Sequence, residues 1–170
     1  MAGAVNAPAA GGPTPAEWRA AMGSFPTGVT IITSWQAGRP VGSTISAFCS
    51  VSLVPPLLLF CLDFTNPLLE PVRASGVFGV NILAEEDGAA IARHFAVNPE
   101  ADRFERYPYR AEPGGAPQLE AAPVFIDCLV EQTMTAGDHL VLIGRGLRTD
   151  HPFAAPPLVY HQGKLGLPRP

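Results

Sequence analysis

Charged side chains are scarce in this chain, and positive ones are the scarcer kind. Asp, Glu, Lys and Arg make up 15% of the 170 residues, and the formal net charge is -4. A nucleic-acid partner or an anionic membrane would require a basic face, so this balance argues against both. Because 47% of the residues are hydrophobic, the low charge also indicates apolar surface that a subunit interface covers.

Several other signals are missing. No apolar run approaches the roughly 20 residues that span a bilayer, and the first residues lack the basic and apolar pattern of a signal peptide. Cys49, Cys61 and Cys128 are odd in number and form no Cys-x-x-Cys pair, which predicts reduced thiols in a cytoplasmic protein. Rossmann, P-loop, nucleophile-elbow and zinc-ligand motifs are absent from the sequence, so we expect neither a metal nor a Rossmann dinucleotide site.

The length fits one domain. Residues 1–13 are mostly Ala, Gly and Pro, a composition typical of a disordered leader, which leaves residues 14–170 as the folded domain. Thr14-Pro15-Ala16-Glu17 predicts a capped helix that ends at Gly23. Phe25-Pro26-Thr27-Gly28 follows as an expected turn.

The remaining pattern is rich in short strands. We expect strands at 29–34, 57–62, 77–83, 124–134, 140–147 and 158–160, short helices at 71–75 and 85–94, and a long polar surface loop over 95–118. This content predicts a mainly β fold, a mostly antiparallel barrel with peripheral helices. The run 57–62 is apolar on both faces, so we expect it to be the central strand, with a partner subunit covering one side.

Hydroxyl side chains gather between Gly42 and Ser52. That stretch holds five of them and no charge. Neutral hydroxyl and backbone donors suit a polar planar ligand or a phosphate. The alternative is a strand whose hydroxyls face solvent.

Two other polar residues have two interpretations each. Asn81 lies among apolar strand residues, where an unpartnered amide would be costly; it either bonds neighbouring backbone or faces a ligand, and we favour the ligand. His139 follows the turn dipeptide Gly137-Asp138, so it is either an exposed hairpin imidazole or a group that moves a proton or orients a cofactor.

A series of motifs follows in order along the chain. They are Phe25-Pro26-Thr27-Gly28-Val29, the segment 42–52, Pro55-Pro56 with its apolar strand, Phe78-Gly79-Val80-Asn81-Ile82-Leu83, His94-Phe95-Ala96, and Gly137-Asp138-His139. From Trp18 to Gly163 the chain closely resembles the short-chain flavin reductases, the reductase components of two-component flavin-dependent monooxygenases.

The resemblance implies a split β-barrel of Greek-key type, assembled as a homodimer with FMN or FAD near the subunit interface. Such a protein is an NAD(P)H:flavin oxidoreductase. NADH or NADPH would donate a hydride to the flavin, and free reduced flavin would diffuse to a partner monooxygenase.

The resemblance also implies site residues. The flavin contacts would be Thr27, Gly28, Ser43, Thr44, Ile45, Ser46, Ser50, Val51, Ser52, Asn81 and Leu83. Thr65 and Asn66 would contact a phosphate, and His139 would lie near the nicotinamide. Many relatives have Ser or Arg in the loop after the 57–62 strand. Asp63 stands there in this chain and would repel a phosphate unless it points away, which leaves the choice between FMN and FAD open.

Hydride transfer needs no protein nucleophile, because the flavin carries the chemistry. Neutral donors would give a moderate affinity for the flavin. A moderate affinity suits a cofactor that must leave after it is reduced. The alternatives are an electron-transfer flavoprotein with tightly held FMN and a non-catalytic flavin-binding module. An oxidase of a small amine or phosphate ester is disfavoured by the lack of basic residues near the hydroxyl segment.

Overall fold

The computed structural model describes residues 11–97, 100–151 and 155–166, so most of the predicted leader lies outside the described residues. The helices are α1 (Pro15–Gly23), α2 (Leu69–Ser75), α3 (Glu85–Val97) and α4 (Glu100–Arg106). The strands are β1 (Thr27–Gly28), β2 (Thr30–Gln36), β3 (Arg39–Ile45), β4 (Phe48–Leu53), β5 (Pro56–Asp63), β6 (Val77–Ile82), β7 (Tyr109–Arg110), β8 (Gln118–Leu119), β9 (Val124–Ala136), β10 (His139–Asp150), β11 (Val159–His161) and β12 (Lys164–Leu165). The mainly β fold is as predicted.

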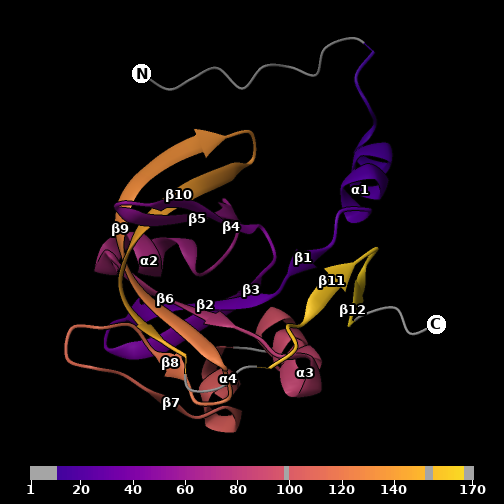
Figure 1. Cartoon of the computed structure of the whole chain (residues 1–170). Helices are drawn as coiled ribbons and strands as arrows, with labels where there is room; N and C mark the ends of the chain where they lie inside the picture. The colour runs from indigo at the N-terminus through magenta and orange to yellow at the C-terminus, as the bar shows by residue number, and fades with distance from the viewer. Residues whose placement is uncertain (1–10, 98–99, 152–154, 167–170) are drawn as a thin grey trace.

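The largest sheet is antiparallel and has seven strands in the order β3-β2-β6-β9-β10-β5-β4. Figure 1 shows this sheet strongly curved, with α1, α3 and α4 outside it. The expectation that β5 is central was wrong, because β9 occupies the centre and β5 is next to the edge strand β4. Burial alternates along β5: Leu58, Phe60 and Leu62 are buried, and the residues between them are half-buried.

The core inside the barrel draws side chains from β2, β3, β5, β6, β9 and β10 and from the segment that includes α2. Phe60 and Phe78 meet there with ring centroids 4.9 Å apart. A Cβ at Gly144 would lie 2.2 Å from the Phe78 ring, so this close approach requires glycine. α2 begins two residues earlier than predicted, since Pro71 fits within its first turn.

A second apolar cluster lies on the outer face of β2. α3 contributes Ile91 and Phe95, which pack with Ile31 and Leu158. The predicted surface loop 95–118 is wrong in part, because it contains the end of α3, all of α4, and β7 paired with β8. α4 is anchored by the buried Arg103, whose guanidinium donates to the carbonyl of Gly42.

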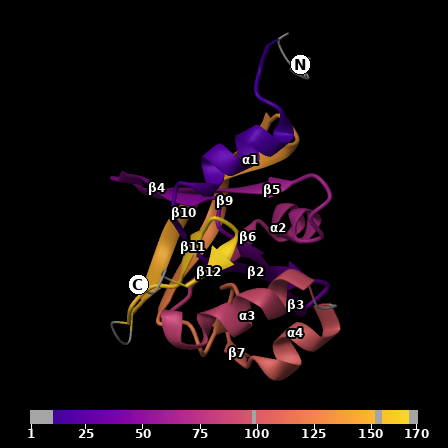
Figure 2. The ribbon, with the colours of Figure 1, turned by 90° about the vertical axis from the view of Figure 1, so that its right-hand side faces the viewer.

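The N-terminal helix and the C-terminal hairpin stand beside the barrel (Figures 1 and 2). α1 has the predicted capping box between Thr14 and Glu17, and no residue of α1 is buried. The expected turn at 25–28 ends instead in β1, which pairs with β11. The Gln162 N–H donates to the Gly23 carbonyl at 2.9 Å and ties the hairpin to the end of α1. Within the described ranges, none of the helices has the length and apolarity to cross a bilayer.

Candidate functional site

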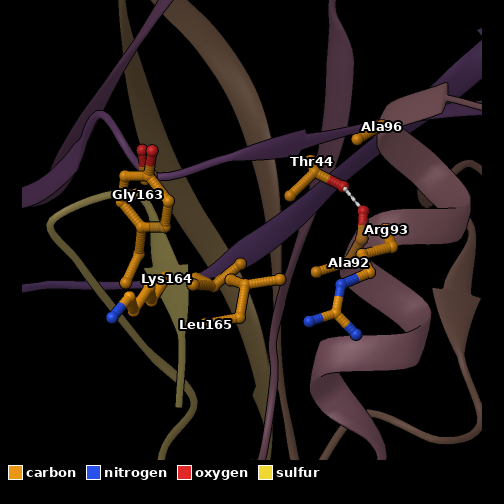
Figure 3. Close-up of a pocket in the computed structure, with 10 residues that line it drawn as sticks. Thr44, Ala92, Arg93, Ala96, Gly163, Lys164 and Leu165 are labelled. Atoms are coloured by element: carbon orange, nitrogen blue, oxygen red, sulfur yellow. Dashed lines mark hydrogen bonds between the residues drawn. The ribbon is translucent and has the colours of Figure 1, made fainter. Parts of the chain in front are cut away.

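A cavity of about 550 Å³ opens between the end of β3, the last turns of α3 and the β11–β12 hairpin (Figure 3). Its lining is Val29, Thr44, Ser46, Ala92, Arg93, Ala96, Tyr160, Gly163, Lys164 and Leu165. This volume lies within the range of small-molecule sites. Of the predicted site residues, Thr44 and Ser46 line the cavity. Tyr160 forms one of its walls.

The predicted contacts at 43–46 divide between two faces of β3, since side chains alternate along a strand. Thr44 faces α3, and its hydroxyl donates to the Ala92 carbonyl at 2.7 Å, which leaves the oxygen able to accept. Ser43 and Ile45 are buried on the opposite face, where Ile45 belongs to the barrel core. Ser43 and Ile45 are therefore turned away from the cavity.

Thr27 on β1 has a buried hydroxyl for which the structure shows no hydrogen-bond partner. Thr27 pairs with Tyr160 of the cavity wall, and Val29, two residues further along the chain, lines the cavity. Neighbouring Gly28 is exposed, and a Cβ added there would meet no atom within 4 Å. A buried hydroxyl without a partner costs free energy, so Thr27 is a candidate ligand contact.

Two cations in the lining were missed by the sequence reasoning. Arg93 is in the last turns of α3, and Lys164 is on β12. From the sequence we expect no basic residues near the hydroxyl segment, but two of them share this cavity with Thr44 and Ser46. Gly163 is a turn residue that could have indicated the hairpin, whose register pairs His161 with Lys164 and Tyr160 with Leu165.

The contacts predicted at Ser50, Val51 and Ser52 lie on the edge strand β4, outside the cavity lining. Ser50 and Val51 are exposed and Ser52 is half-buried. The register with β5 shifts between Ser50 and Ser52, which identifies a bulge at Val51. As an edge, β4 presents backbone donors and acceptors to a ligand or a second chain.

The predicted phosphate contacts Thr65 and Asn66 have other partners. The backbone N–H and the hydroxyl of Thr65 both donate to the Asp63 carboxylate, at 2.8 and 2.5 Å. The Thr65 hydroxyl is the main cause of a lowered pKa at Asp63. The Asn66 amide donates to Ser43 at 3.4 Å and accepts from the Leu68 N–H at 3.0 Å. This loop is closed on itself, so it does not offer these donors to a phosphate.

Asn81 and Leu83 are in the interior. Asn81 is 0% exposed, and its amide donates to the Ile31 carbonyl at 3.1 Å and to the Thr33 hydroxyl at 3.2 Å. Its carbonyl oxygen accepts from the Leu119 N–H at 2.7 Å. Leu83 is buried in the outer cluster. The interpretation that Asn81 bonds neighbouring groups is the one found, and the preference for a ligand was wrong in this structure.

His139 begins β10, directly after the turn at Gly137, and pairs with Asp63 of β5. Its side chain is half-exposed, and Nδ1 lies 2.7 Å from a carboxylate oxygen of Asp138. That bond is the main cause of a lowered pKa at Asp138. His139 is not part of the cavity lining.

Residues 22–166 match the model of the flavin reductase like domain. The reductase subunit HsaB of a flavin-dependent monooxygenase from Rhodococcus jostii is 37% identical over 150 residues, which cover 88% of this chain and 76% of that protein. The stachydrine N-demethylase reductase subunit Stc3 of Rhizobium meliloti is 40% identical over 132 residues, covering 77% of this chain and 56% of that protein. The solved structure of the Streptomyces globisporus NADH:FAD oxidoreductase SgcE6 in complex with NAD and FAD fragments superposes with a TM-score of 0.83 at 30% identity, covering 91% of this chain and 93% of that chain.

Proposed function

This chain belongs to the flavin reductase like domain family, and from that premise we propose that it reduces FMN or FAD with NADH or NADPH and supplies the reduced flavin to a partner monooxygenase. The similarity spans residues 22–166, which include every wall of the cavity. The relatives named as reductase subunits of monooxygenases support the partner.

The observation that carries the proposal is the cavity of about 550 Å³. The unpartnered hydroxyl of Thr27 is two residues before Val29 in its wall. Its surroundings fit a flavin, which needs a slot with an apolar wall and a few polar groups at its edges. Val29, Ala92 and Leu165 supply apolar surface, and Ser46 supplies a hydroxyl. When bound, the flavin supplies the hydride-accepting ring.

We assign the residues of this chain binding and positioning roles. Thr27, Thr44 and Ser46 would hold polar groups of the flavin, and Gly28 would leave room for its ring against the β1 backbone. The exposed backbone of β4 at Ser50–Ser52 is a second surface for the same ligand. His139 would orient the nicotinamide.

We further propose that the protein is a cytoplasmic homodimer. Trp18, Met22 and Phe25 are 57, 50 and 67% exposed, and Leu53 and Val54 at the β4–β5 turn are 87 and 92% exposed. Large apolar side chains of this kind are commonly covered by another chain. A second copy is the occupant that the family resemblance favours. Free cysteines at Cys49, Cys61 and Cys128 are consistent with a reducing compartment.

The test is NADH or NADPH oxidation with FMN, FAD or riboflavin as acceptor. We expect flavin-dependent turnover with at least one combination, and no oxidation under any of them would reject the proposal. His139→Ala should lower the rate of flavin reduction more than it weakens flavin binding. If binding is weakened and the rate with saturating flavin is unchanged, His139 is a flavin contact and does not orient the nicotinamide.

A further inference from the structure

Arg93 and Lys164 lie on opposite sides of the cavity, one on helix α3 and the other on the hairpin strand β12 (Figure 3). The lining contains no Asp or Glu. Lys164 is also the sole lysine of the sequence. Two elements that are distant in the chain therefore place positive charge in one cavity of a protein whose net charge is -4.

Several arginines of the structure are paired with carboxylates, whereas Arg19 and Arg39 on the exposed surface, like the two cavity cations, have no ion pair among the described side chains. Arg73, Arg110, Arg145 and Arg148 each lie within 4.0 Å of a carboxylate. Among the side chains that the structure describes, at 11–97, 103–151 and 155–166, Arg93 and Lys164 have no carboxylate within 4.0 Å. Since acidic residues outnumber basic ones by 15 to 11, cations left without a carboxylate in a cavity indicate an anionic ligand.

We propose that Arg93 and Lys164 bind a phosphate group of the ligand that occupies this cavity, which makes them specificity-determining residues. The inference rests on the proposed function, because the phosphate would belong to the flavin or to the nicotinamide nucleotide. Arg donates a planar fork of N–H groups that matches a phosphate, and Lys adds a point charge. The neutral hydroxyls of Thr44 and Ser46 then contact other polar groups of the ligand.

Arg93 also offsets the partial negative charge at the C-terminal end of α3, which would disfavour a bound phosphate. The last turn of an α-helix presents partial negative charge from its free carbonyls. In α3 that turn includes Ala96 and Val97, and Arg93 comes directly before it. Without the guanidinium, this wall would repel a phosphate. Both side chains are exposed, so solvent and salt screen their attraction, and we expect about a tenfold loss of affinity for each cation removed.

The test compares FMN with riboflavin, which has the same ring system and no phosphate. Arg93→Gln and Lys164→Gln should each raise the dissociation constant for FMN about tenfold and leave that for riboflavin unchanged. Lys164→Arg should retain most of the affinity. Arg39→Gln is the matched control, since Arg39 is exposed and lies at the far end of β3 from the cavity.

A second source of the phosphate is the nicotinamide nucleotide. If the variants weaken NADPH more than NADH and leave FMN unchanged, the phosphate bound is the one that distinguishes these two nucleotides, which also supports the proposal. Equal effects of the variants on FMN and riboflavin, with no change for either nucleotide, would overturn it.

A readout independent of turnover uses the single lysine. Reductive methylation with ¹³C-formaldehyde gives one lysine signal in NMR spectra, apart from that of the N-terminal amine. Addition of FMN should shift the signal more than riboflavin does, and Arg93→Gln should reduce the FMN shift. An inactive enzyme whose lysine signal still responds to FMN would reject the proposed function alone. A signal that FMN, NADH and NADPH all leave in place would reject the phosphate site.

Discussion

Replacement of Asn81 by Leu tests whether this residue stabilises the fold or contacts a ligand. The side chain is fully buried and makes three hydrogen bonds, to Ile31, Thr33 and Leu119. Leucine is close in size but offers no polar atom. The substitution therefore removes hydrogen bonding with little change in packing volume.

The expected loss in the free energy of unfolding follows from the hydrogen-bonding groups that Asn81→Leu leaves without a partner. The Leu119 N–H loses the acceptor 2.7 Å away, and a buried donor without a partner costs about 1–3 kcal/mol. The Ile31 carbonyl and the Thr33 hydroxyl lose weaker bonds of about 1 kcal/mol each, although Thr33 keeps its bond to the Pro117 carbonyl. We expect a loss of about 3 kcal/mol, a large part of the roughly 5–15 kcal/mol by which domains are stable.

The assay is urea unfolding followed by circular dichroism, with flavin affinity measured on the folded variant. Asn81→Leu should unfold at lower urea and bind flavin within about twofold of the parent protein, since a change under about 0.4 kcal/mol is near the precision of such measurements. Asn66→Ala is the matched control, with an expected loss of about 1 kcal/mol. Unchanged stability together with lost flavin affinity would refute the structural assignment and restore the ligand role that the sequence suggested.

Three further predictions follow from local geometry. Gly28→Ala should change the free energy of unfolding by less than about 0.5 kcal/mol, because the added Cβ meets no atom within 4 Å, yet it should weaken flavin binding; unchanged binding in a fluorescence titration would remove Gly28 from the site. Burial raises the pKa of the Cys128 thiol to about 12, so an aromatic disulfide reagent at pH 8 should label exposed Cys49 in the native protein and Cys128 only in urea, as mapped by mass spectrometry. The lowered pKa of Asp63 means that its contribution to stability is complete above its ordinary pKa of 3.8 and is lost as the pH falls through the lowered value. The difference in Tm between the parent and Asp63→Asn should therefore shrink from about pH 5 to about pH 3, and a constant difference would contradict the role of the Thr65 bond.

Local signals predicted most of the elements. Thr14 and Glu17 form the predicted capping box, and the β-branched run at 29–34 is largely β2. The acidic start of the expected helix at 85 is the start of α3. In each case the information lies within one turn of helix or one strand, where hydrogen bonding and side-chain spacing decide the structure.

Tertiary contacts decided what the sequence could not. β5 lies next to the edge strand β4. The central places are taken by β9, which pairs with β6 and β10, and by β10, which pairs with β9 and β5. α4 was missed within a polar segment, since its anchor is the bond from Arg103 to the Gly42 carbonyl, a partner far away in the chain. The proposed contacts at 43–46 were treated as one surface, although the period of a strand turns Ser43 and Thr44 to opposite faces.

The cavity depends on a pairing that no local pattern reveals. β1 and β11 come from opposite ends of the chain, and the register of Thr27 with Tyr160 brings the unpartnered hydroxyl beside the hairpin that carries Lys164. The barrel core takes no side chain from β1, β11 or β12. The residues proposed to bind the ligand are therefore largely separate from those that form the barrel core. It follows that substitutions in the hairpin should alter ligand affinity with little effect on unfolding, whereas substitutions at Asn81 should do the reverse.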